Sequence, residues 1–359
     1  MSPWLAARNI LAIRLDNIGD VVMLGPALRA VKEASPDARI TLLASPAGAT
    51  AGPLLPWVDD VIELRPFWQD IHGRIPFDPS REQTFISEIA ARAFDATLIF
   101  TSFSQTPHVP GYLCYLAGIP LRAGTSKEFA GTTLTTQVDS APDTIHQVER
   151  NLRLVEAVGF PVRDRDLQVR APREAKTAVP ALLRRAGLDP ESPYFLLHPG
   201  ASAAARRYSP ERFGEIARLL MVHGRQVLVT GVAREQEVVD VVAARAPGAG
   251  VLLDGTSLVE YAALMESAAL VICGNTLPLH LADAVRTPVV GLYAGTDYEE
   301  QWMPRRTPCT LLRRPTTCYP CYLFTCPIGQ PCLDYDPLDV VAAAEDLLRR
   351  APPMLQEVG

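Results

Sequence analysis

The sequence predicts an α/β protein built from two doubly wound parallel sheets, and two observations support this prediction. Short apolar runs of strand length alternate with amphipathic stretches of helix length along most of the chain, a pattern typical of parallel sheets covered by helices. The chain has 359 residues, which at roughly 150 residues per domain indicates two domains rather than one. We therefore expect two halves of the same α/β class that face a central cleft.

The first half opens with a complete βαβ unit. Asn9 to Leu15 is predicted as a buried strand, Val21 to Ala34 as a helix and Arg39 to Ala44 as the next strand. A unit of this length fits a Rossmann-like sheet. Further elements are expected as strands at Asp60 to Leu64, Ala96 to Phe100 and Arg122 to Gly124, and as a helix at His146 to Val158.

A charged, proline-punctuated segment follows, and we place the domain junction within residues 161–180. The predicted domains are 1–165 and 180–336, and the helix and tail at 337–359 can pack on either of them. The alternation then resumes, with strands at Tyr194 to Leu197, Gln226 to Thr230, Val251 to Leu253, Leu270 to Cys273 and Pro288 to Tyr293, and helices at Pro210 to His223, Glu235 to Arg245, Leu258 to Ser267 and Leu279 to Val285.

Composition and charge exclude several classes of protein. With 48% hydrophobic and 21% charged residues, the chain is globular rather than disordered. The net charge of -6 provides no general attraction for nucleic acid or anionic lipid. The sequence has no apolar run of about 18 residues and no signal-peptide pattern at its start. We therefore expect a cytoplasmic protein.

The loop after the first strand carries two carboxylates and a glycine. The segment Arg14 to Asp20 contains no GxGxxG dinucleotide fingerprint. Asp16 and Asp20 bracket a turn in which Gly19 allows a backbone conformation that a Cβ would penalise. Asp20, at the start of a helix, is either an N-cap or a general base that deprotonates an acceptor hydroxyl. The spacing by itself favours the N-cap, which is the commoner use of Asp there.

Small residues after a later strand precede a pair of arginines. The segment His198 to Ser202 is followed by Arg206 and Arg207 just before a helix, so backbone N–H groups, a helix N-terminus and guanidinium charge can face a phosphate. Part of the same pattern is ordinary helix capping, with Ser209 at the N-cap and Pro210 at the first helical position. Both interpretations can hold together.

A third polar segment, Gly274 to His280, follows the apolar strand that ends at Cys273. Asn275 and Thr276 stand at the end of this strand, where open α/β sheets bind ligands, and can form hydrogen bonds with a polyhydroxylated ligand. The alternative is a capped helix with a packed histidine, and for His280 alone this alternative is favoured.

Four cysteines lie close together near the end of the chain, at Cys318, Cys321, Cys326 and Cys332. Their number matches a tetrahedral thiolate site for zinc or iron. Four thiolates leave no open coordination position, so such a site would be structural rather than catalytic. Reduced thiols in a tight loop, or disulfides, are the alternatives.

Taken in order, these motifs resemble glycosyltransferase family 9, the ADP-heptose:lipopolysaccharide heptosyltransferases and their relatives. The resemblance is carried by IRLDNIGDVV with GPAL, by HPGAS with RRYSPERF, and by NTLPLHLADA with TPVVGLY. The helix that begins near His146 and the cysteine-bearing tail also match, so the resemblance covers nearly the whole chain. It implies a GT-B fold of two Rossmann-like domains, the C-terminal one holding most of the donor, and metal-independent inverting transfer of a sugar.

The resemblance also implies roles for individual residues. The position of Asp20 matches the proposed catalytic base, which reverses the preference stated above, and Arg206 stands where the family has a phosphate-binding Lys. Without a metal, Asp20 would take the acceptor proton and Arg206 would stabilise the leaving diphosphate. The remaining donor contacts, which include the nucleotide ribose at Glu235, are implied at Gly19, Ser202, Glu235, Asn275, Thr276 and His280.

The chain departs from the family at Asn275, where an Asp is usual, and this loss of charge leaves the donor sugar open. We expect a nucleotide-sugar donor, with ADP-heptose as the first choice, and a glycan, lipid-linked or small-molecule acceptor. Nucleic acid is not expected as a partner, and peripheral contact with the inner face of a membrane stays open. Two alternatives are a non-catalytic nucleotide-sugar-binding protein of the same fold and, ranked lower, a GT-B epimerase that acts on UDP-sugars.

Overall fold

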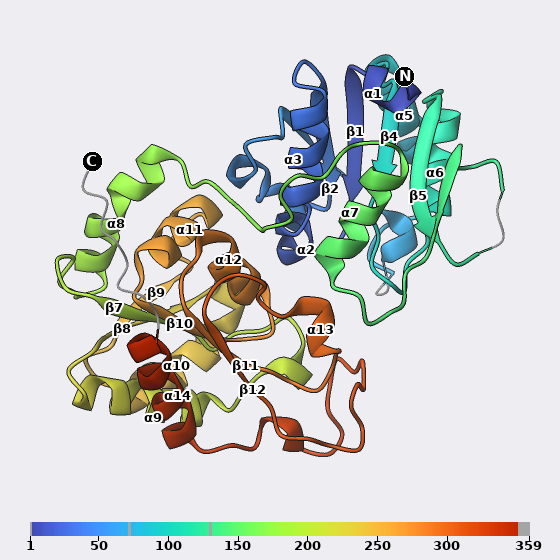
Figure 1. Cartoon of the computed structure of the whole chain (residues 1–359). Coiled ribbons are helices and arrows are strands. Elements are labelled where there is room, and N and C mark those ends of the chain that lie inside the picture. The colour runs from blue at the N-terminus through green and yellow to red at the C-terminus, as the bar shows by residue number, and fades with distance from the viewer. Residues whose placement is uncertain (1, 71–72, 129–130, 351–359) are drawn as a thin grey trace. The chain divides into compact units, whose positions relative to one another are not determined.

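The computed structural model describes residues 2–70, 73–128 and 131–350 and divides the chain into two compact units, Met1–Arg170 and Ala171–Gly359 (Figure 1). The division falls inside the 161–180 segment in which the sequence places the junction. Each unit contains one parallel six-stranded sheet. Each sheet has helices around it, so the doubly wound α/β prediction is confirmed.

The first unit has the strand order β3-β2-β1-β4-β5-β6. Its strands are β1 (Asn9–Arg14), β2 (Arg39–Ala44), β3 (Asp60–Glu63), β4 (Ala96–Ile99), β5 (Leu121–Ser126) and β6 (Thr136–Asp139). The central strand β1 is buried from its second residue to its last, because helices cover both faces of a parallel sheet. All five pairings within the sheet are parallel, and they fix the register of β1 against β2 and β4.

The helices of the first unit pack as three pairs, α3 against α7, α2 against α4 and α5 against α6. The helical elements are α1 (Pro3–Ala6), α2 (Ile18–Val22), α3 (Gly25–Ala34), α4 (Pro46–Ala49), α5 (Pro79–Ala91), α6 (His108–Leu116) and α7 (Gln147–Ala157), with the 3₁₀ turns η1 (Gly52–Leu54) and η2 (Phe67–Gln69). The single helix predicted from Val21 to Ala34 is wrong, because α2 ends before Pro26 and α3 begins beside it. Proline lacks the N–H that would continue α2, but it fits the first turn of a new helix.

The second unit repeats the arrangement with the order β12-β11-β10-β7-β8-β9. Its strands are β7 (Tyr194–His198), β8 (Gln226–Gly231), β9 (Gly250–Leu253), β10 (Leu270–Gly274), β11 (Val289–Leu292) and β12 (Cys309–Leu312). All five pairings are parallel here too. The strands β7 and β10 lie side by side in the middle of the sheet, and the core packs around them.

The helices of the second unit also form two groups, with α9 packed against α10 and α14, and α11 packed against α8 and α12. The helical elements are α8 (Arg173–Arg185), α9 (Pro210–Val222), α10 (Gln236–Arg245), α11 (Leu258–Ser267), α12 (Leu277–Val285), α13 (Glu299–Trp302) and α14 (Pro337–Arg350), with the 3₁₀ turns η3 (Ala204–Arg206), η4 (Ala233–Glu235) and η5 (Pro331–Leu333). The last helix, whose partner the sequence left open, packs against α9, β11 and β12 of its own unit.

Each strand order contains a point at which the direction of winding reverses. In the first unit this switch point lies between β1 and β4, and in the second between β7 and β10. Open α/β sheets bind ligands outside the carboxyl ends of the strands at such points. The loops that follow these four strands are therefore the places to look for a functional site.

Candidate active site

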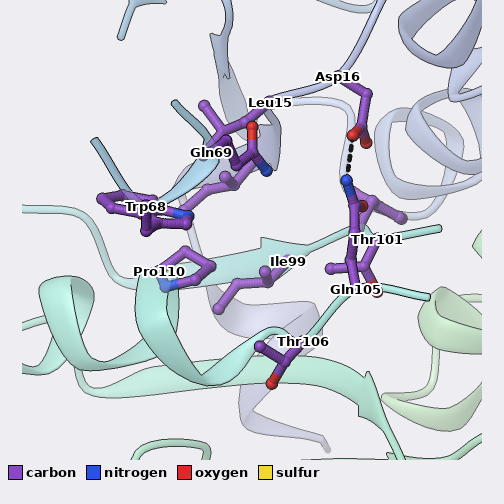
Figure 2. Close-up of a pocket in the computed structure, with 11 residues that line it drawn as sticks. Leu15, Asp16, Trp68, Gln69, Ile99, Thr101, Gln105, Thr106 and Pro110 are labelled. Atoms are coloured by element: carbon purple, nitrogen blue, oxygen red, sulfur yellow. Dashed lines mark hydrogen bonds between the residues drawn. The ribbon is translucent and has the colours of Figure 1, made fainter. Parts of the chain in front are cut away.

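In the first unit, the loops that follow β1 and β4 are joined by side chains. Asp16 lies just after β1, and its carboxylate accepts a hydrogen bond from the side-chain amide of Gln105 in the loop after β4 (Figure 2). Arg14, the last residue of β1, donates from Nη2 to the Ser102 hydroxyl over 2.9 Å. The acidic loop predicted as functional therefore lies at the switch point of its sheet.

The guanidinium of Arg14 is the centre of this arrangement. Its side chain has 0% exposure, its Nε lies 2.8 Å from Asp16 Oδ2, and its Nη2 lies 2.8 Å from Asp20 Oδ1. Burying a charge is costly unless it is paired, so the two carboxylates compensate the buried cation. Arg14 in turn holds both carboxylates in place. Its charge is compensated by these two residues and is not exposed to a ligand.

The structure corrects the predicted place of Asp20 in its helix. Asn17, which has an extended backbone, is the N-cap of α2, and Asp20 is the third residue of the helix. Its Oδ2 accepts the backbone N–H of Asn17 over 3.2 Å, while its Oδ1 faces Arg14. The N-cap interpretation of Asp20 is therefore wrong. Its side chain keeps 13% exposure, so the carboxylate still has access to a ligand.

Gly19 differs from its prediction as well. The sequence predicts a turn there that excludes a Cβ, but Gly19 is buried within α2 and is not one of the described residues with a positive φ. The backbone of a right-handed helix is open to every residue, so conformational freedom does not explain this glycine. The donor contact implied for Gly19 stays a prediction.

Asp16 lines a small cavity at the same edge of the sheet, which Figure 2 shows in close-up. Burial raises the pKa of Asp16, and the neighbouring Asp20 charge raises it further, although Arg14 and the hydrogen bond from Gln105 act in the opposite direction. The two carboxylates therefore have different surroundings. Asp20 accepts a backbone N–H in the first turn of a helix, whereas Asp16 lies against the cavity.

In the second unit, the loops after β7 and β10 come together in the same way. A Cβ placed on Gly274, at the end of β10, would lie 3.2 Å from the backbone carbonyl oxygen of Arg206. The segments 198–207 and 274–280, which the sequence singled out separately, therefore meet at the β7/β10 switch point.

Glu235 is buried beside the loop that follows β7. Its side chain has 4% exposure, and its Oε2 accepts the N–H of Val232 over 3.1 Å and lies 3.7 Å from His198 Nε2. Burial lowers the pKa of His198 in spite of this carboxylate, so the imidazole is neutral near pH 7. Its Nδ1 lies 3.2 Å from the hydroxyl oxygen of Thr230. The Glu235 carboxylate therefore has no cationic partner here and keeps the capacity to accept hydrogen bonds from a ligand.

Gly200 offers a test of this packing. A Cβ at this position would lie 2.2 Å from the carboxyl carbon of Glu235 and 2.3 Å from one of its oxygens, so Gly200→Ala must displace the carboxylate. We expect the free energy of unfolding, measured by urea denaturation, to fall by about 1–3 kcal/mol. A Cβ on Gly131 would meet nothing within 4 Å, so Gly131→Ala is the control and should leave stability unchanged. Equal stability of the two variants would contradict the close packing.

Arg206 lies at the end of η3, and its guanidinium is held from the loop after β11. Its Nε donates to the Thr296 hydroxyl over 3.1 Å, and its Nη2 lies 2.7 Å from Asp297 Oδ2. The side chain keeps 31% exposure, so part of the guanidinium is open to a ligand. Arg207 instead donates from Nε to the carbonyl of Ala201 over 3.0 Å. The two neighbouring arginines therefore differ, and Arg206 is the one supported at the switch point.

The predicted polar residues around Arg206 differ in their burial and in their hydrogen bonds. Asn275 is buried, and its Oδ1 accepts the N–H of Ala294 over 3.2 Å, which ties the end of β10 to the loop after β11. The hydroxyl oxygen of Thr276 is buried and has no hydrogen-bond partner among the described residues. Such a group costs free energy unless something pairs with it, so a ligand is a natural partner. Ser202 is exposed on the loop after β7.

His280 is packed inside the unit rather than exposed. It lies in α12, and its ring centroid is 6.1 Å from that of Trp302. Burial lowers the pKa of His280 to about 4; the Asp283 carboxylate opposes this shift and the Arg206 cation adds to it. The packed-histidine alternative therefore accounts for the burial of His280. Arg206 is near enough to lower the pKa of His280, so this histidine lies near the same edge of the sheet.

The burial of His280 makes the protein sensitive to acid. An unfolded histidine titrates near 6.5, whereas His280 titrates at about 4 in the folded chain, so between these values the unfolded chain binds the extra proton. Stability is therefore present above pH 6.5 and is lost as the pH falls towards 4, by up to about 1.4 kcal/mol per pH unit. We expect urea unfolding at pH 7.5, 6.0 and 5.0 to show a smaller acid loss in His280→Gln. Parallel losses in the two proteins would contradict this origin.

The four cysteines predicted as a metal site lie in one segment, where the Cys326 and Cys318 thiols are close enough to Cys332 to influence its pKa. Within residues 2–70, 73–128 and 131–350, no three His, Cys, Asp or Glu side chains form a group that could hold a metal ion. Cys332 is buried and Cys318 is exposed, and all four are free thiols in the segment between β12 and α14. Burial raises the pKa of the Cys332 thiol. The metal site at these cysteines stays a prediction.

The segment 318–332, which we call the cysteine loop, is hydrogen-bonded to the loops around the Arg206 side chain. The N–H of Ala205 donates to the carbonyl of Phe324 over 2.9 Å, and the N–H of Tyr322 donates to the carbonyl of Thr296 over 2.8 Å. One bond reaches the loop after β7 and the other reaches the loop after β11. The cysteine loop therefore contacts both segments that hold Arg206.

Comparison with known proteins now decides the family. The model of glycosyltransferase family 9 (heptosyltransferase) matches residues 89–330, which is more than half of the chain. The chain belongs to glycosyltransferase family 9. It is therefore an enzyme that transfers a sugar.

Individual relatives of this family 9 protein agree with the match. A protein of Haemophilus influenzae, to which glycosyltransferase activity is ascribed, is 25% identical over 313 residues, 82% of this chain and 86% of that protein. Among solved structures, a family 9 glycosyl transferase from Veillonella parvula has a TM-score of 0.78 at 18% identity and covers 96% of this chain and 98% of its own. Escherichia coli ADP-heptose lps heptosyltransferase II has a TM-score of 0.74 at 20% identity, with coverages of 95% and 98%. These likenesses show the GT-B fold.

Over residues 2–70, 73–128 and 131–350, no helix of this family 9 enzyme combines the length and the apolar character that crossing a membrane needs.

Sequence reasoning missed three members of this family 9 site. Arg14 ends an otherwise apolar strand, and a charge in a buried strand is itself a signal that a compensating partner must exist. Thr296 and Asp297 follow the apolar strand β11, so the rule that ligands bind after strands would have pointed to them. Arg206, which both of them contact, however, lies about 90 positions earlier in the chain.

Proposed function

We propose that this glycosyltransferase moves a heptose from ADP-heptose to a hydroxyl of a glycan, lipid-linked or small-molecule acceptor, with inversion and without a catalytic metal. The main observation behind this proposal is the partly exposed Arg206 side chain at the β7/β10 switch point. Guanidinium groups bind diphosphates through paired charge-assisted hydrogen bonds. The named activity of the E. coli structural relative supports ADP-heptose as the donor.

The surrounding side chains suit the other parts of such a donor. The buried Glu235 carboxylate has acceptor capacity for the two ribose hydroxyls. The unpaired Thr276 hydroxyl provides a partner for phosphate or sugar oxygen, and the exposed Ser202 lies on the loop that leads to Arg206. Because the Oδ1 of Asn275 is taken by a backbone N–H, this side chain offers its NH₂ group as a donor to the sugar.

The reaction needs one base and one site of positive charge. Asp20 accepts the proton of the acceptor hydroxyl while the acceptor oxygen forms a bond to the anomeric carbon of the donor. The bond from that carbon to the diphosphate oxygen breaks, and its electron pair leaves with ADP. Arg206 stabilises the charge that develops on the diphosphate, as preorganised cations do at leaving groups. Arg14 keeps Asp20 in a single orientation for the proton transfer.

The test is to incubate the purified protein with ADP-heptose, UDP-glucose and GDP-mannose and to follow nucleotide diphosphate release, with and without a bacterial glycolipid extract as acceptor. We expect ADP release from ADP-heptose, faster with acceptor, and no loss of rate in EDTA. Absence of release from every donor would contradict the enzyme. Binding of ADP in a calorimeter without turnover would favour the non-catalytic alternative, for which Asn275 in place of an acid is the specific observation.

A further inference from the structure

The cavity beside Asp16 is the feature that the proposed chemistry does not yet use. It lies at the β1/β4 switch point and is lined by both apolar and polar side chains (Figure 2). Ile13 and Ile99 come from the two central strands, Trp68 lies on one side, and Asp16 with Gln105 lies on the other. An apolar surface with a few converging polar groups is the usual composition of a small-ligand site.

The size of the cavity limits what can enter it. Its volume is about 20 Å³, which is slightly more than a water molecule needs. A whole sugar ring cannot enter a space of this volume, but one hydroxyl or hydroxymethyl group can. A ring that inserted such a group would lie over the opening, where the half-buried Trp68 side chain offers an apolar surface to its C–H face.

The charges around the cavity favour an uncharged occupant. None of the described residues that line it is Lys or Arg. The guanidinium of Arg14, beside Asp16, has no exposed surface and is paired with Asp16 and Asp20. A carboxylate brought into this space would meet the Asp16 charge without a compensating cation, whereas a hydroxyl can donate to one of the carboxylate oxygens.

We propose that this cavity is the acceptor subsite and that it selects a neutral sugar, taking one hydroxyl-bearing group against Asp16 while the ring lies on Trp68. The inference rests on the proposed function, because it places this subsite on the loop that also carries Asp20. It goes further by naming the chemical class of the acceptor: an uncharged glycosyl residue rather than a carboxylated one.

One residue at the same edge would give the opposite specificity. Arg65 follows β3, three positions before Trp68, and its side chain is exposed. An acidic acceptor would be recognised by such an exposed cation and not by the cavity. Arg65→Ala therefore serves as the variant that separates the two modes of recognition.

The experiment is ligand-observed NMR on the full-length protein with two probes that differ in a single group, methyl α-D-glucopyranoside and its C6 carboxylate, methyl α-D-glucopyranosiduronate. We expect the neutral probe to bind at least about tenfold more tightly, a difference of roughly 1.4 kcal/mol. Absence of binding by the neutral probe, or tighter binding by the carboxylate, would overturn the proposal.

Two variants test the residues themselves. Trp68→Ala should weaken the neutral probe by about fivefold to tenfold, whereas Phe77→Ala, a matched aromatic truncation at a side chain that is 95% exposed, should leave it unchanged. Asp16→Asn should reduce the preference for the neutral probe to less than about threefold, because the repelling charge is gone. If Arg65→Ala weakens either probe more than Trp68→Ala does, the assignment is wrong.

Failure of this inference can be told apart from failure of the proposed function. Binding of ADP reports on the second unit, and neither this binding nor hydrolysis of ADP-heptose depends on the choice of acceptor. Normal donor turnover together with a preference for the carboxylated probe would reject the subsite and keep the glycosyltransferase. Binding of the neutral probe without donor turnover would keep the subsite and reject the donor assignment.

Discussion

Asp20→Asn should lower kcat by about 10²–10⁴-fold, the range that loss of a general base produces. The substitution keeps the size of the side chain and leaves an oxygen for the N–H of Asn17, so α2 keeps its N-terminal hydrogen bond. Arg14 loses one of its two carboxylate partners but keeps Asp16. The measurement is initial rates of ADP release and glycan transfer, with the melting temperature recorded in parallel.

A matched control comes from an Asp that takes no part in the site. Asp37 has an 86% exposed side chain and pairs with an exposed Arg8 over 3.3 Å, so Asp37→Asn should leave kcat unchanged. We expect the donor KM of Asp20→Asn to stay near the wild-type value, because the base acts on the acceptor. A kcat within threefold of wild type in a folded Asp20→Asn protein would remove Asp20 from the role of base.

Arg206→Ala should lower kcat by about 10²–10³-fold, as loss of one preorganised charge at a leaving group does, and should weaken ADP binding as well. Asp297 is buried and would lose its cationic partner, so this variant should also be less stable. Arg206→Lys separates the two effects. Lysine restores a positive charge but lacks the planar group that contacts Thr296 and Asp297 together, so only part of the rate should return.

The control for this prediction is Arg218→Ala on α9, where an exposed guanidinium pairs with the exposed Glu215 over 2.6 Å. It should change neither kcat nor ADP affinity, because exposed ion pairs contribute little. Calorimetry with ADP gives the affinities, and urea unfolding gives the stabilities. If Arg206→Ala binds ADP as tightly as Arg218→Ala does, the phosphate contact must lie elsewhere.

The central part of each sheet could be predicted from the sequence because buried parallel strands are apolar along their whole length. The strands at Asn9–Arg14 and Leu270–Gly274 show this clearly, and both were found. The edge strands at Thr136–Asp139 and Cys309–Leu312 were missed. Their residues are only partly buried, so they lack the continuous apolar run that marks a central strand.

The helix Arg173–Arg185 was also missed, for a different reason. It contains Pro180 and begins among charged residues, and the sequence was interpreted there as a linker. Its buried residues nevertheless include Val179 and Leu183, which lie one helical turn apart and pack this helix on the second unit. Tertiary packing compensates for the proline, which local propensity cannot anticipate.

Local motifs identified the loops of the site but not the contacts that organise them. The spacing of Arg14 and Asp20 gives no helical or strand period, because a strand end, a loop and a helix start lie between them. The pairing of Arg206 with Asp297 links the loop after β7 to the loop after β11, and the order of the strands in the sheet brings these loops together. Such contacts depend on topology, so they became visible only once the strand order was known.

The cysteine loop is hydrogen-bonded to the loop after β7, which carries Arg206, so the two segments are coupled. Because the carbonyl of Phe324 accepts the N–H of Ala205, we expect a change of length or bulk in the cysteine loop to shift the neighbouring Arg206. Alkylation of the exposed Cys318 thiol would act through the same attachment. If Arg206 binds the donor as proposed, a change in this peripheral segment should alter the affinity for the nucleotide.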